Sequence, residues 1–413
     1  MVDLSHHINT KSKARHPSPL KDIIKFMAYD GMVSFAGGLP HPSLFPLEQA
    51  KFDCLSPAVP LTADRHSVDQ EKADELSLKF GRGLSTGDLD LTQFLQYGSG
   101  AGNRQLIALA KELTEKVHSP PCEYECLLHP GNTNAWAKVV GLLCEDDDFV
   151  IVEEFTYPSA QALWIPMGIK AVPVAADAAG IMAKNLRTLL LNWDERERGA
   201  RRPRVLYLVP VGSNPTGITI STQRRREIYK ICVECDIIIV EDDPYYFLQY
   251  PGYGTFVETS FTPKPIPEFL KTLVPTFLSM DTQGRVIRLD SFSKTLFPGL
   301  RLGFVDPGAG MFVWCKFYFD GIDRFMEIEG AAKSKDPEQD FSNELWQAWA
   351  TELVLLTPGS YYHAWQGPNK MTTAARGADP RTAHFRFSFA TPTKEEISSG
   401  VARLAKVIAK YWK

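Results

Sequence analysis

The feature of this sequence that most limits its fold is a regular alternation of short β-rich runs and amphipathic helical stretches between about residues 126 and 304. The runs are rich in Val, Ile and Leu, and no turn typical of a β-hairpin separates them. This pattern predicts an α/β fold, in which a mainly parallel central sheet carries helices on both faces. The expected strands are 149–153, 170–174, 205–209, 236–240 and 286–289, with a short addition at 302–304, and the expected helices include 133–143 and 222–234.

The sequence on either side of this region has a different character. Residues 1–95 contain many Pro and Gly residues and one helical candidate near 46–52, which predicts an N-terminal arm and the start of a smaller domain. After Pro307 the pattern predicts strands at 311–319, 353–356 and 384–389, a loop with helical pieces at 320–341, and a final helix from Lys394. We therefore expect three parts, at 1–95, at 96–304 for a large α/β domain, and at 305–413 for a small α+β domain.

Composition excludes several classes of function. The 413-residue chain has a net charge of −4, and its basic clusters at 196–204 and 224–226 lie in or beside polar loops, so no nucleic-acid partner is expected. No stretch is long and apolar enough to cross a bilayer, so no membrane role is expected. The seven cysteines are scattered and complete no tetrahedral site with histidines, which predicts reduced thiols and no metal. A cytoplasmic location follows, although basic and hydroxyl residues near Lys11 also allow a mitochondrial presequence.

The clearest chemical signal is the segment SFSK at 291–294, which follows an expected strand. There the Lys294 ammonium can be partly desolvated, which favours a neutral amine that attacks carbonyls. Ser291, Ser293 and Arg301 together could hold a doubly charged anion. These residues predict a lysine that forms an imine with an aldehyde carrying a phosphate, and pyridoxal 5′-phosphate fits that description. Taken alone, such a segment is more often a solvated surface turn.

Other residues with fitting chemistry follow the neighbouring strands, and open parallel sheets bind ligands at the carboxyl ends of their strands. Asn214 lies in the turn PVGSNPTG at 210–217, while Asp242 and Tyr245 lie in EDDPYY at 241–246. A buried carboxylate at Asp242 could hold a pyridine nitrogen protonated and so make the ring an electron sink. An ordinary turn and a solvated acidic turn are the alternatives for these two segments.

Two more segments extend the same pattern. The turn HPGNTN at 129–134 precedes an expected helix and presents backbone amides, which suit an anion. Tyr157 follows the strand at 149–153 and could stack on a planar ring, although a lone tyrosine more often lies in a core or at its rim. Four strand ends that supply a phosphate site, a ring partner, a stacking group and a lysine favour one cofactor site.

These segments resemble those of fold-type I aminotransferases, which use pyridoxal phosphate, and most closely the group of fungal aromatic amino acid, 2-aminoadipate and kynurenine aminotransferases. The resemblance covers nearly the whole chain. It implies the fold of the type I pyridoxal-phosphate-dependent transferases, with a large α/β and a smaller α+β domain. The segments that carry it are SNPTG, EDDPYYFLQ and SFSKTLFPGLRLGF, with RHPSPL at 15–20, FAGGLPHPSLFP at 35–46, QYGSGAGN at 96–103 and HFRFSFA at 384–390.

The resemblance also implies a role for each matching position. Lys294 would be the Schiff-base lysine and proton shuttle, Asp242 would pair with the pyridinium nitrogen, and Tyr157 would stack on the ring. Asn214 and Tyr245 would hydrogen-bond the phenolic oxygen of the cofactor. The phosphate ligands would be Asn132, Thr133, Ser291, Ser293 and Arg301, with Tyr97 contributed by the neighbouring subunit of a homodimer.

On the substrate side, the resemblance implies that Arg386 clamps the α-carboxylate through a bidentate pair, for which guanidinium geometry is well suited. Arg15 would belong to an arm over the substrate, and Gly38 and Asn214 would contribute to the substrate site. The implied reaction is a ping-pong transamination from an aromatic, 2-aminoadipate-like or kynurenine-like amino acid to 2-oxoglutarate. A lyase or decarboxylase of the same fold type is the alternative among enzymes.

The sequence departs from the family pattern at one place. In relatives, RLGF is followed by a helix between the domains and the start of the small domain, whereas here Phe304 continues directly into VDPGAGMFVW at 305–314. We therefore expect that a segment of roughly a hundred residues is missing from the normal two-domain layout, together with the domain hinge and part of the dimer surface. This departure raises two alternatives, an inactive protein that binds pyridoxal phosphate and an incomplete gene model or splice form.

Overall fold

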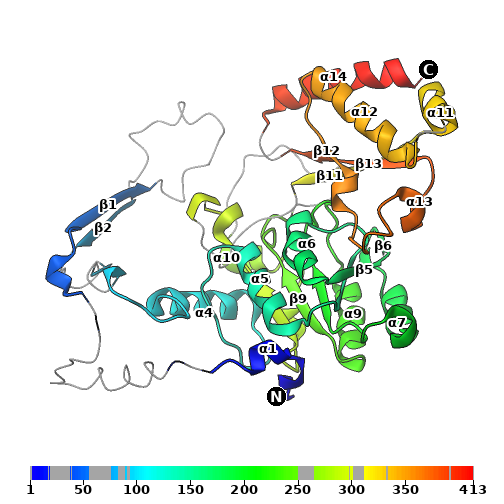
Figure 1. The fold of residues 1–413 in the computed structure, drawn as a ribbon. Coiled ribbons are helices and arrows are strands. Elements are labelled where there is room, and N and C mark those ends of the chain that lie inside the picture. Colours follow the sequence, from blue (N-terminus) through cyan, green and yellow to red (C-terminus); the bar gives the residue numbers. More distant parts are fainter. Residues whose placement is uncertain are drawn as a thin grey trace. The chain divides into compact units, whose positions relative to one another are not determined.

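A parallel five-stranded sheet is the centre of the larger of two compact units into which the chain divides (Figure 1). This unit consists of Met1–Ala14 and Leu109–Lys413, and the second unit is Arg15–Ala108. The computed structural model describes residues 2–16, 18, 38, 40–54, 76–81, 89–90, 94–249, 265–296, 298–300, 311–331, 334–389 and 392–412.

The strand order of the central sheet is β10-β9-β8-β4-β5, and all neighbouring strands are parallel. The strands are β4 (Phe149–Glu153), β5 (Lys170–Val174), β8 (Val205–Leu208), β9 (Ile238–Asp242) and β10 (Val286–Leu289). The five main strands predicted from the sequence are confirmed, but β9 lies two residues later than expected. Asp242 therefore ends a strand instead of beginning a turn. The short strand expected at 302–304 lies outside the described residues.

Helices cover both faces of this sheet, as the alternation predicted. On one face α5 (Asn132–Leu143) and α6 (Pro158–Trp164) pack against Val150, Val152 and Tyr207. On the other face α7 (Ala183–Leu191) and α9 (Thr222–Glu234) pack against Ile151 and Leu206. Because successive side chains of a strand point to opposite faces, strands that are covered on both sides must be apolar throughout.

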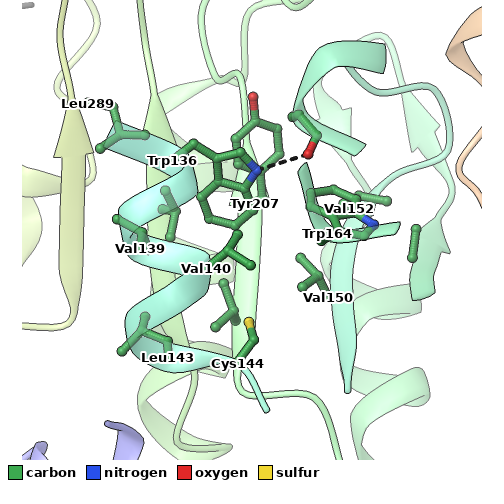
Figure 2. Packing of buried hydrophobic residues seen from close by; sticks show 14 of the residues in the cluster. Trp136, Val139, Val140, Leu143, Cys144, Val150, Val152, Trp164, Tyr207 and Leu289 are labelled. Carbon is green, nitrogen blue, oxygen red and sulfur yellow. Dashed lines mark hydrogen bonds between the residues drawn. The ribbon is translucent and has the colours of Figure 1, made fainter. Parts of the chain in front are cut away.

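Figure 2 shows the packing on the first face, where the indole of Trp136 lies beside Tyr207 and near Trp164. The ring centroids of Trp136 and Tyr207 are 4.7 Å apart, and those of Trp136 and Trp164 are 5.7 Å apart with the rings nearly perpendicular. The indole nitrogen of Trp136 donates to the Ala160 carbonyl over 3.2 Å. This contact ties the start of α5 to α6, next to the carboxyl ends of the strands.

Shorter elements complete this part of the unit. A small antiparallel hairpin of β6 (Ala176–Asp177) and β7 (Gly180–Ile181) corrects the expectation of no hairpin. Its turn is closed by Asp177, whose side chain accepts from the Ala179 amide over 2.8 Å, and by Gly180 at φ +96°. The other helices and 3₁₀ turns are η1 (Ser5–His7), α1 (Thr10–Lys13), α4 (Arg104–His118), η5 (Ile165–Met167), α8 (Glu195–Arg198), α10 (Ile266–Leu270), η6 (Leu278–Met280), η7 (Phe292–Lys294) and η8 (Pro298–Leu300).

The C-terminal part forms a second, antiparallel sheet in the order β11-β13-β12. Its strands are β11 (Phe312–Tyr318), β12 (Thr357–Pro358) and β13 (Thr382–Ser388). The strand expected at 353–356 is wrong, because pairing with β13 begins only at Thr357. The segment 320–341, expected to be a loop with helical pieces, contains α11 and the start of α12. The helices here are α11 (Asp323–Gly330), α12 (Pro337–Thr351), η9 (Gly359–Tyr362), α13 (Thr373–Arg376) and α14 (Lys394–Tyr411).

The second unit contains η2 (Pro42–Leu44) and a three-stranded sheet of β1 (Gln49–Cys54), β2 (Leu76–Gly81) and β3 (Leu89–Asp90). The helix expected near 46–52 is wrong, since Gln49–Cys54 pairs with β2 as an antiparallel strand. Its sequence, QAKFDC, alternates polar and apolar residues, which is the pattern of a strand with one apolar face. Across the described part of the chain, none of the helices has the length and apolarity that a bilayer crossing requires.

Candidate active site

A cavity of about 520 Å³ lies at the carboxyl ends of β8, β9 and β10, beside the first turns of α5 and α6. Residues of β11 and β13 line its other side. The cavity therefore brings together segments that are far apart in the sequence. The predicted site residues that line it are Asn132, Thr133, Tyr157, Asn214, Asp242, Tyr245, Ser291, Ser293, Lys294 and Arg386.

The Asp242 carboxylate is buried in the wall of this cavity and accepts a hydrogen bond on each oxygen. The Asn132 amide nitrogen donates to Oδ1 over 2.7 Å, and the Tyr207 hydroxyl donates to Oδ2 over 2.6 Å. Burial raises the pKa of Asp242, whereas the hydrogen bonds from Tyr207 and Asn132 and the charge of Arg288 lower it. The two donors thus favour the ionised carboxylate against the desolvation that opposes it.

The Asn132 side chain, expected to be a phosphate ligand, instead binds other groups of the protein. Its amide nitrogen donates to Asp242 and also to the Leu289 carbonyl over 2.9 Å, which uses both hydrogens. Its oxygen is buried without a hydrogen-bond partner. The side chain therefore has no donor left for a phosphate. What the start of α5 offers an anion is the backbone N–H of Asn132 and Thr133, in a first turn that lacks intrahelical acceptors.

The Lys294 turn is held by its own serines. Ser291, at the N-terminus of η7, accepts from the Ser293 amide over 3.0 Å and donates to the Ser293 hydroxyl over 2.8 Å. The Lys294 side chain is exposed, yet the surrounding protein removes enough water to lower its pKa. The positive charge of Arg386 lowers the pKa of Lys294 further. Both effects favour the neutral amine that imine chemistry requires.

Arg386 reaches the cavity from β13 and is fixed by polar and aromatic contacts. Its Nη1 donates to Asn214 Oδ1 over 2.9 Å, and its Nη2 donates to Thr357 Oγ1 over 3.3 Å. The guanidinium lies 4.2 Å from the centroid of the Phe312 ring. Nε of Arg386 is buried without a partner. This arrangement holds a permanent positive charge at one end of the cavity.

Two tyrosines complete the lining. Tyr245 is buried, and burial raises its pKa above the usual value, while a hydrogen bond from Asn214 works in the opposite direction. Tyr157 is half-buried and stands immediately before α6, with Pro158 as the first residue of the helix. Both tyrosines line the cavity, and the roles expected of them toward the cofactor stay predictions.

Four predicted residues lie elsewhere or outside the description. Arg301 lies in the stretch 301–310, outside the described residues. Arg15, Gly38 and Tyr97 belong to the second unit, where all three are exposed. Their roles stay predictions.

Sequence reasoning missed three residues that shape the site: Tyr207, Thr357 and Phe312. Tyr207 occurs in the apolar strand VLYLV, and a hydroxyl in a strand buried on both faces must find a hydrogen-bond partner. That requirement could have identified it as a partner for a buried carboxylate. Thr357 and Phe312 carry no comparable signal in the sequence. Their side chains lie near Arg386 because of the strand pairing in the C-terminal sheet.

Comparison with known proteins places this site in a family. The model of aminotransferases of class I and II matches residues 88–306, which is more than half of the chain. The chain belongs to this family. Among its aminotransferase relatives, the aromatic amino acid aminotransferase C56E4.03 of Schizosaccharomyces pombe is 38% identical over 310 residues, which cover 73% of this chain and 63% of the relative. The L-tyrosine:2-oxoglutarate aminotransferase atrD of Tapinella panuoides is 38% identical over 359 residues, covering 86% and 63%.

The aminotransferase fold is also found by comparison of structures. The aminotransferase Aro8 of Candida albicans superposes with a TM-score of 0.84 and 26% identity, over 99% of this chain and 98% of that one. The predicted fold, that of the type I pyridoxal-phosphate-dependent transferases, is thereby confirmed. The matches span 63%, 66% and 58% of the length of three curated aminotransferases. The match to the family model ends at residue 306, close to Phe304, and the missing segment after Phe304 stays a prediction.

Pyridoxal phosphate is the cofactor that membership in this aminotransferase family implies. The residues of the cavity fit it on chemical grounds. A buried carboxylate with two donors suits a protonated ring nitrogen, an amine with a lowered pKa suits an aldehyde, and the first turn of α5 suits a phosphate. Among the described residues, the group of side chains close enough together to hold a metal ion, His6 with His7 and Asp236, does not line this cavity.

Proposed function

We propose that this protein is a pyridoxal-phosphate-dependent transaminase that moves the amino group of an aromatic amino acid to 2-oxoglutarate. The observation that carries the proposal is the convergence of Lys294, Asp242 and Arg386 on one cavity. The names of the relatives support the donor and acceptor, since they include aromatic amino acid and L-tyrosine:2-oxoglutarate aminotransferases. Donors like kynurenine or 2-aminoadipate belong to the same proposal, because relatives from Bos taurus and Rattus norvegicus carry those names.

The cavity residues divide the work of such a reaction. Pyridoxal phosphate, when bound, supplies an electrophilic aldehyde and a ring that withdraws electrons. Asp242 would hold the ring nitrogen, and the backbone amides at the start of α5 with Ser291 and Ser293 would hold the phosphate. Asn214 and Tyr245 line the same cavity and would orient the ring through its phenolic oxygen.

Two basic side chains would act on the substrate: Arg386 would bind it, and Lys294 would deprotonate it. The Arg386 guanidinium would pair with the α-carboxylate, while Phe312 and Asn214 fix its orientation. Lys294 gives up its charge more easily, because desolvation and Arg386 lower its pKa. As a neutral amine it would take the proton from the α-carbon and return it at the other side of the transferred nitrogen.

Two further statements belong to the proposal. A homodimer, in which Tyr97 of a second copy would reach the phosphate, is expected from the family resemblance, and its mass in solution can be measured by light scattering. A cytoplasmic location stays a prediction. The six cysteines that the structure describes as free agree with a reducing compartment.

The test is the half-reaction of the purified protein loaded with pyridoxal phosphate. Mixing with L-tyrosine should convert the cofactor to its amine form, followed by its absorbance, and 2-oxoglutarate should restore it. Lys294→Ala should bind the cofactor but slow the half-reaction by roughly 10²- to 10⁴-fold, because the general base is lost. Lys184→Ala, at an exposed lysine of α7, should react like the wild type.

Three outcomes decide the proposal. Normal turnover by Lys294→Ala would reject the role of the lysine. Cofactor binding by the wild type without conversion by any aromatic, kynurenine-like or aminoadipate-like donor would replace the transaminase with an inactive binding protein. If the segment expected after Phe304 is needed for activity, a chain carrying the corresponding segment of a relative should gain turnover.

A further inference from the structure

The Asp242 carboxylate already has a donor on each oxygen before any ligand is considered. Asn132 donates to one oxygen over 2.7 Å and Tyr207 to the other over 2.6 Å. Each carboxylate oxygen can accept a second hydrogen bond, so a ring nitrogen would be a third donor to the same group. The proton between them can then reside either on the ring nitrogen or on the Asp242 carboxylate.

We propose that Tyr207 and Asn132 are positioning residues that keep this shared proton on the ring nitrogen of the cofactor and off Asp242. The inference rests on the proposed function, and it deepens the role of the same site. A protonated ring withdraws electrons more strongly than a neutral one, so the two donors would set the strength of the electron sink.

The direction follows from burial and hydrogen bonding. In a buried site, desolvation alone favours the neutral pair, a carboxylic acid beside an unprotonated pyridine, over the ionic pair. Hydrogen bonds that donate to the carboxylate stabilise its ionised form and lower its affinity for the proton. Of the other groups near Asp242, Arg288 also favours ionisation, while burial raises the pKa of the Tyr245 hydroxyl and so keeps it neutral.

Both donors are fixed by contacts that do not depend on Asp242. The Tyr207 ring is fully buried, with the Trp136 centroid at 4.7 Å and the Trp164 centroid at 6.4 Å (Figure 2). The Asn132 amide is oriented by its second hydrogen bond, to the Leu289 carbonyl. The donors are therefore already in place when a ligand arrives, which is the property that a positioning residue needs.

Tyr207→Phe is the sharpest test, because it removes one hydroxyl and keeps the ring between the two tryptophans. The matched control is Tyr229→Phe, which removes a tyrosine hydroxyl that donates to the buried Asp281 over 3.0 Å, outside the cavity. Asn132→Ala removes the other donor and provides an independent variant if the first folds poorly. Each protein is loaded with pyridoxal phosphate labelled with ¹⁵N in its ring, and the protonation of that nitrogen is measured by NMR.

The wild type and Tyr229→Phe should show the pyridinium signal across the range from pH 6 to pH 9. Tyr207→Phe and Asn132→Ala should shift the signal toward unprotonated pyridine and slow the tyrosine half-reaction by roughly 10- to 100-fold, since a hydrogen bond to a charged group is lost. An unchanged pyridinium signal in both variants would overturn this inference and leave the proposed function intact. A wild type that binds the cofactor with its nitrogen unprotonated would also overturn it, and a wild type that binds no cofactor would overturn the proposed function as well.

Discussion

Removal of the Arg288 side chain should destabilise the protein far more than removal of a surface arginine. The Arg288 side chain, on β10, is only 4% exposed and contacts three carboxylates: Nε donates to Asp290 over 2.8 Å, and Nη1 lies 3.1 Å from Asp243 and 3.2 Å from Glu241. Arg225, the other cation of this cluster, lies 3.2 Å from Glu241. Without Arg288, three buried carboxylates would share one cation.

The magnitude follows from the burial of the partners. Breaking a buried ion pair by removing one side costs about 3–5 kcal/mol, because the remaining charge is left uncompensated. We therefore expect Arg288→Met to lower the free energy of unfolding by about that amount. Arg324→Met is the matched control, since Arg324 pairs with Glu344 and Glu327 on an exposed surface, where such pairs contribute about 0–1 kcal/mol.

The pH dependence gives a second measurement on the same cluster. Burial raises the pKa of Asp290 from 3.8 to about 7 and that of Asp243 from 3.8 to about 6. Between these values and pH 3.8 the folded state binds protons that the unfolded chain has lost, so stability should fall as the pH rises from about 4 to 7. Asp290→Asn keeps an acceptor for Arg288 and removes one buried charge, and it should weaken this fall.

The assay is urea unfolding of the cofactor-free protein, followed by tryptophan fluorescence at pH 5 and pH 8. Arg288→Met should unfold at a clearly lower urea concentration than the wild type at pH 8, and Arg324→Met should not. If Arg288→Met and Arg324→Met lose the same small amount of stability, the buried cluster does not carry the energy assigned to it here.

Two further predictions concern other parts of the molecule. Asp236→Asn should loosen the N-terminal segment and speed tryptic cleavage after Lys11 and Lys13, because Asp236 accepts hydrogen bonds from His6, His7 and Arg285. Burial raises the pKa of Asp236, but these hydrogen bonds lower it by more, so the pKa in the folded protein lies below 3.8. The stabilisation that Asp236 provides is therefore present above pH 3.8 and is lost as the pH falls below it. Equal cleavage of variant and wild type at neutral pH would contradict this attachment of the N-terminal segment. Trp349→Ala should cost about 3–5 kcal/mol of unfolding free energy, since the indole is fully buried in the C-terminal core with its ring centroid 4.9 Å from that of Phe385, and a loss below 1 kcal/mol in urea unfolding would show that the core refills the space.

Much of the central sheet could be predicted from the sequence, because strands buried on both faces must be apolar throughout. That rule located FVIVE, which matches β4, and VLYLV, whose first four residues form β8. It also misplaced the end of β9, since Glu241 and Asp242 look like solvated turn residues. They continue the strand because Arg225, Arg288, Asn132 and Tyr207 satisfy their oxygens, and none of these partners is adjacent in sequence.

The location of the cavity could be predicted from the residues that follow the strands. The directions in which its side chains point could not. Asn132 is the first residue of α5, where backbone amides could bind a phosphate, yet its side chain turns to Asp242, and only the three-dimensional position of β9 decides this. The short strand β12 is fixed by pairing with β13 and not by its own residues, Thr357 and Pro358. The helix expected near 46–52 failed for another reason, since the alternation in QAKFDC is visible in the sequence and favours a strand.

The side chains of three consecutive acidic residues at the end of one strand, Glu241, Asp242 and Asp243, lie in two separate environments. Asp242 lines the cavity, while its two neighbours meet buried arginines. A substitution at Arg288 is thus tolerable only with a matching change at positions 241, 243 or 290, which lie in two different segments of the chain. Among homologous sequences, these four positions should therefore vary together, whereas the identity of residue 242 should be independent of them.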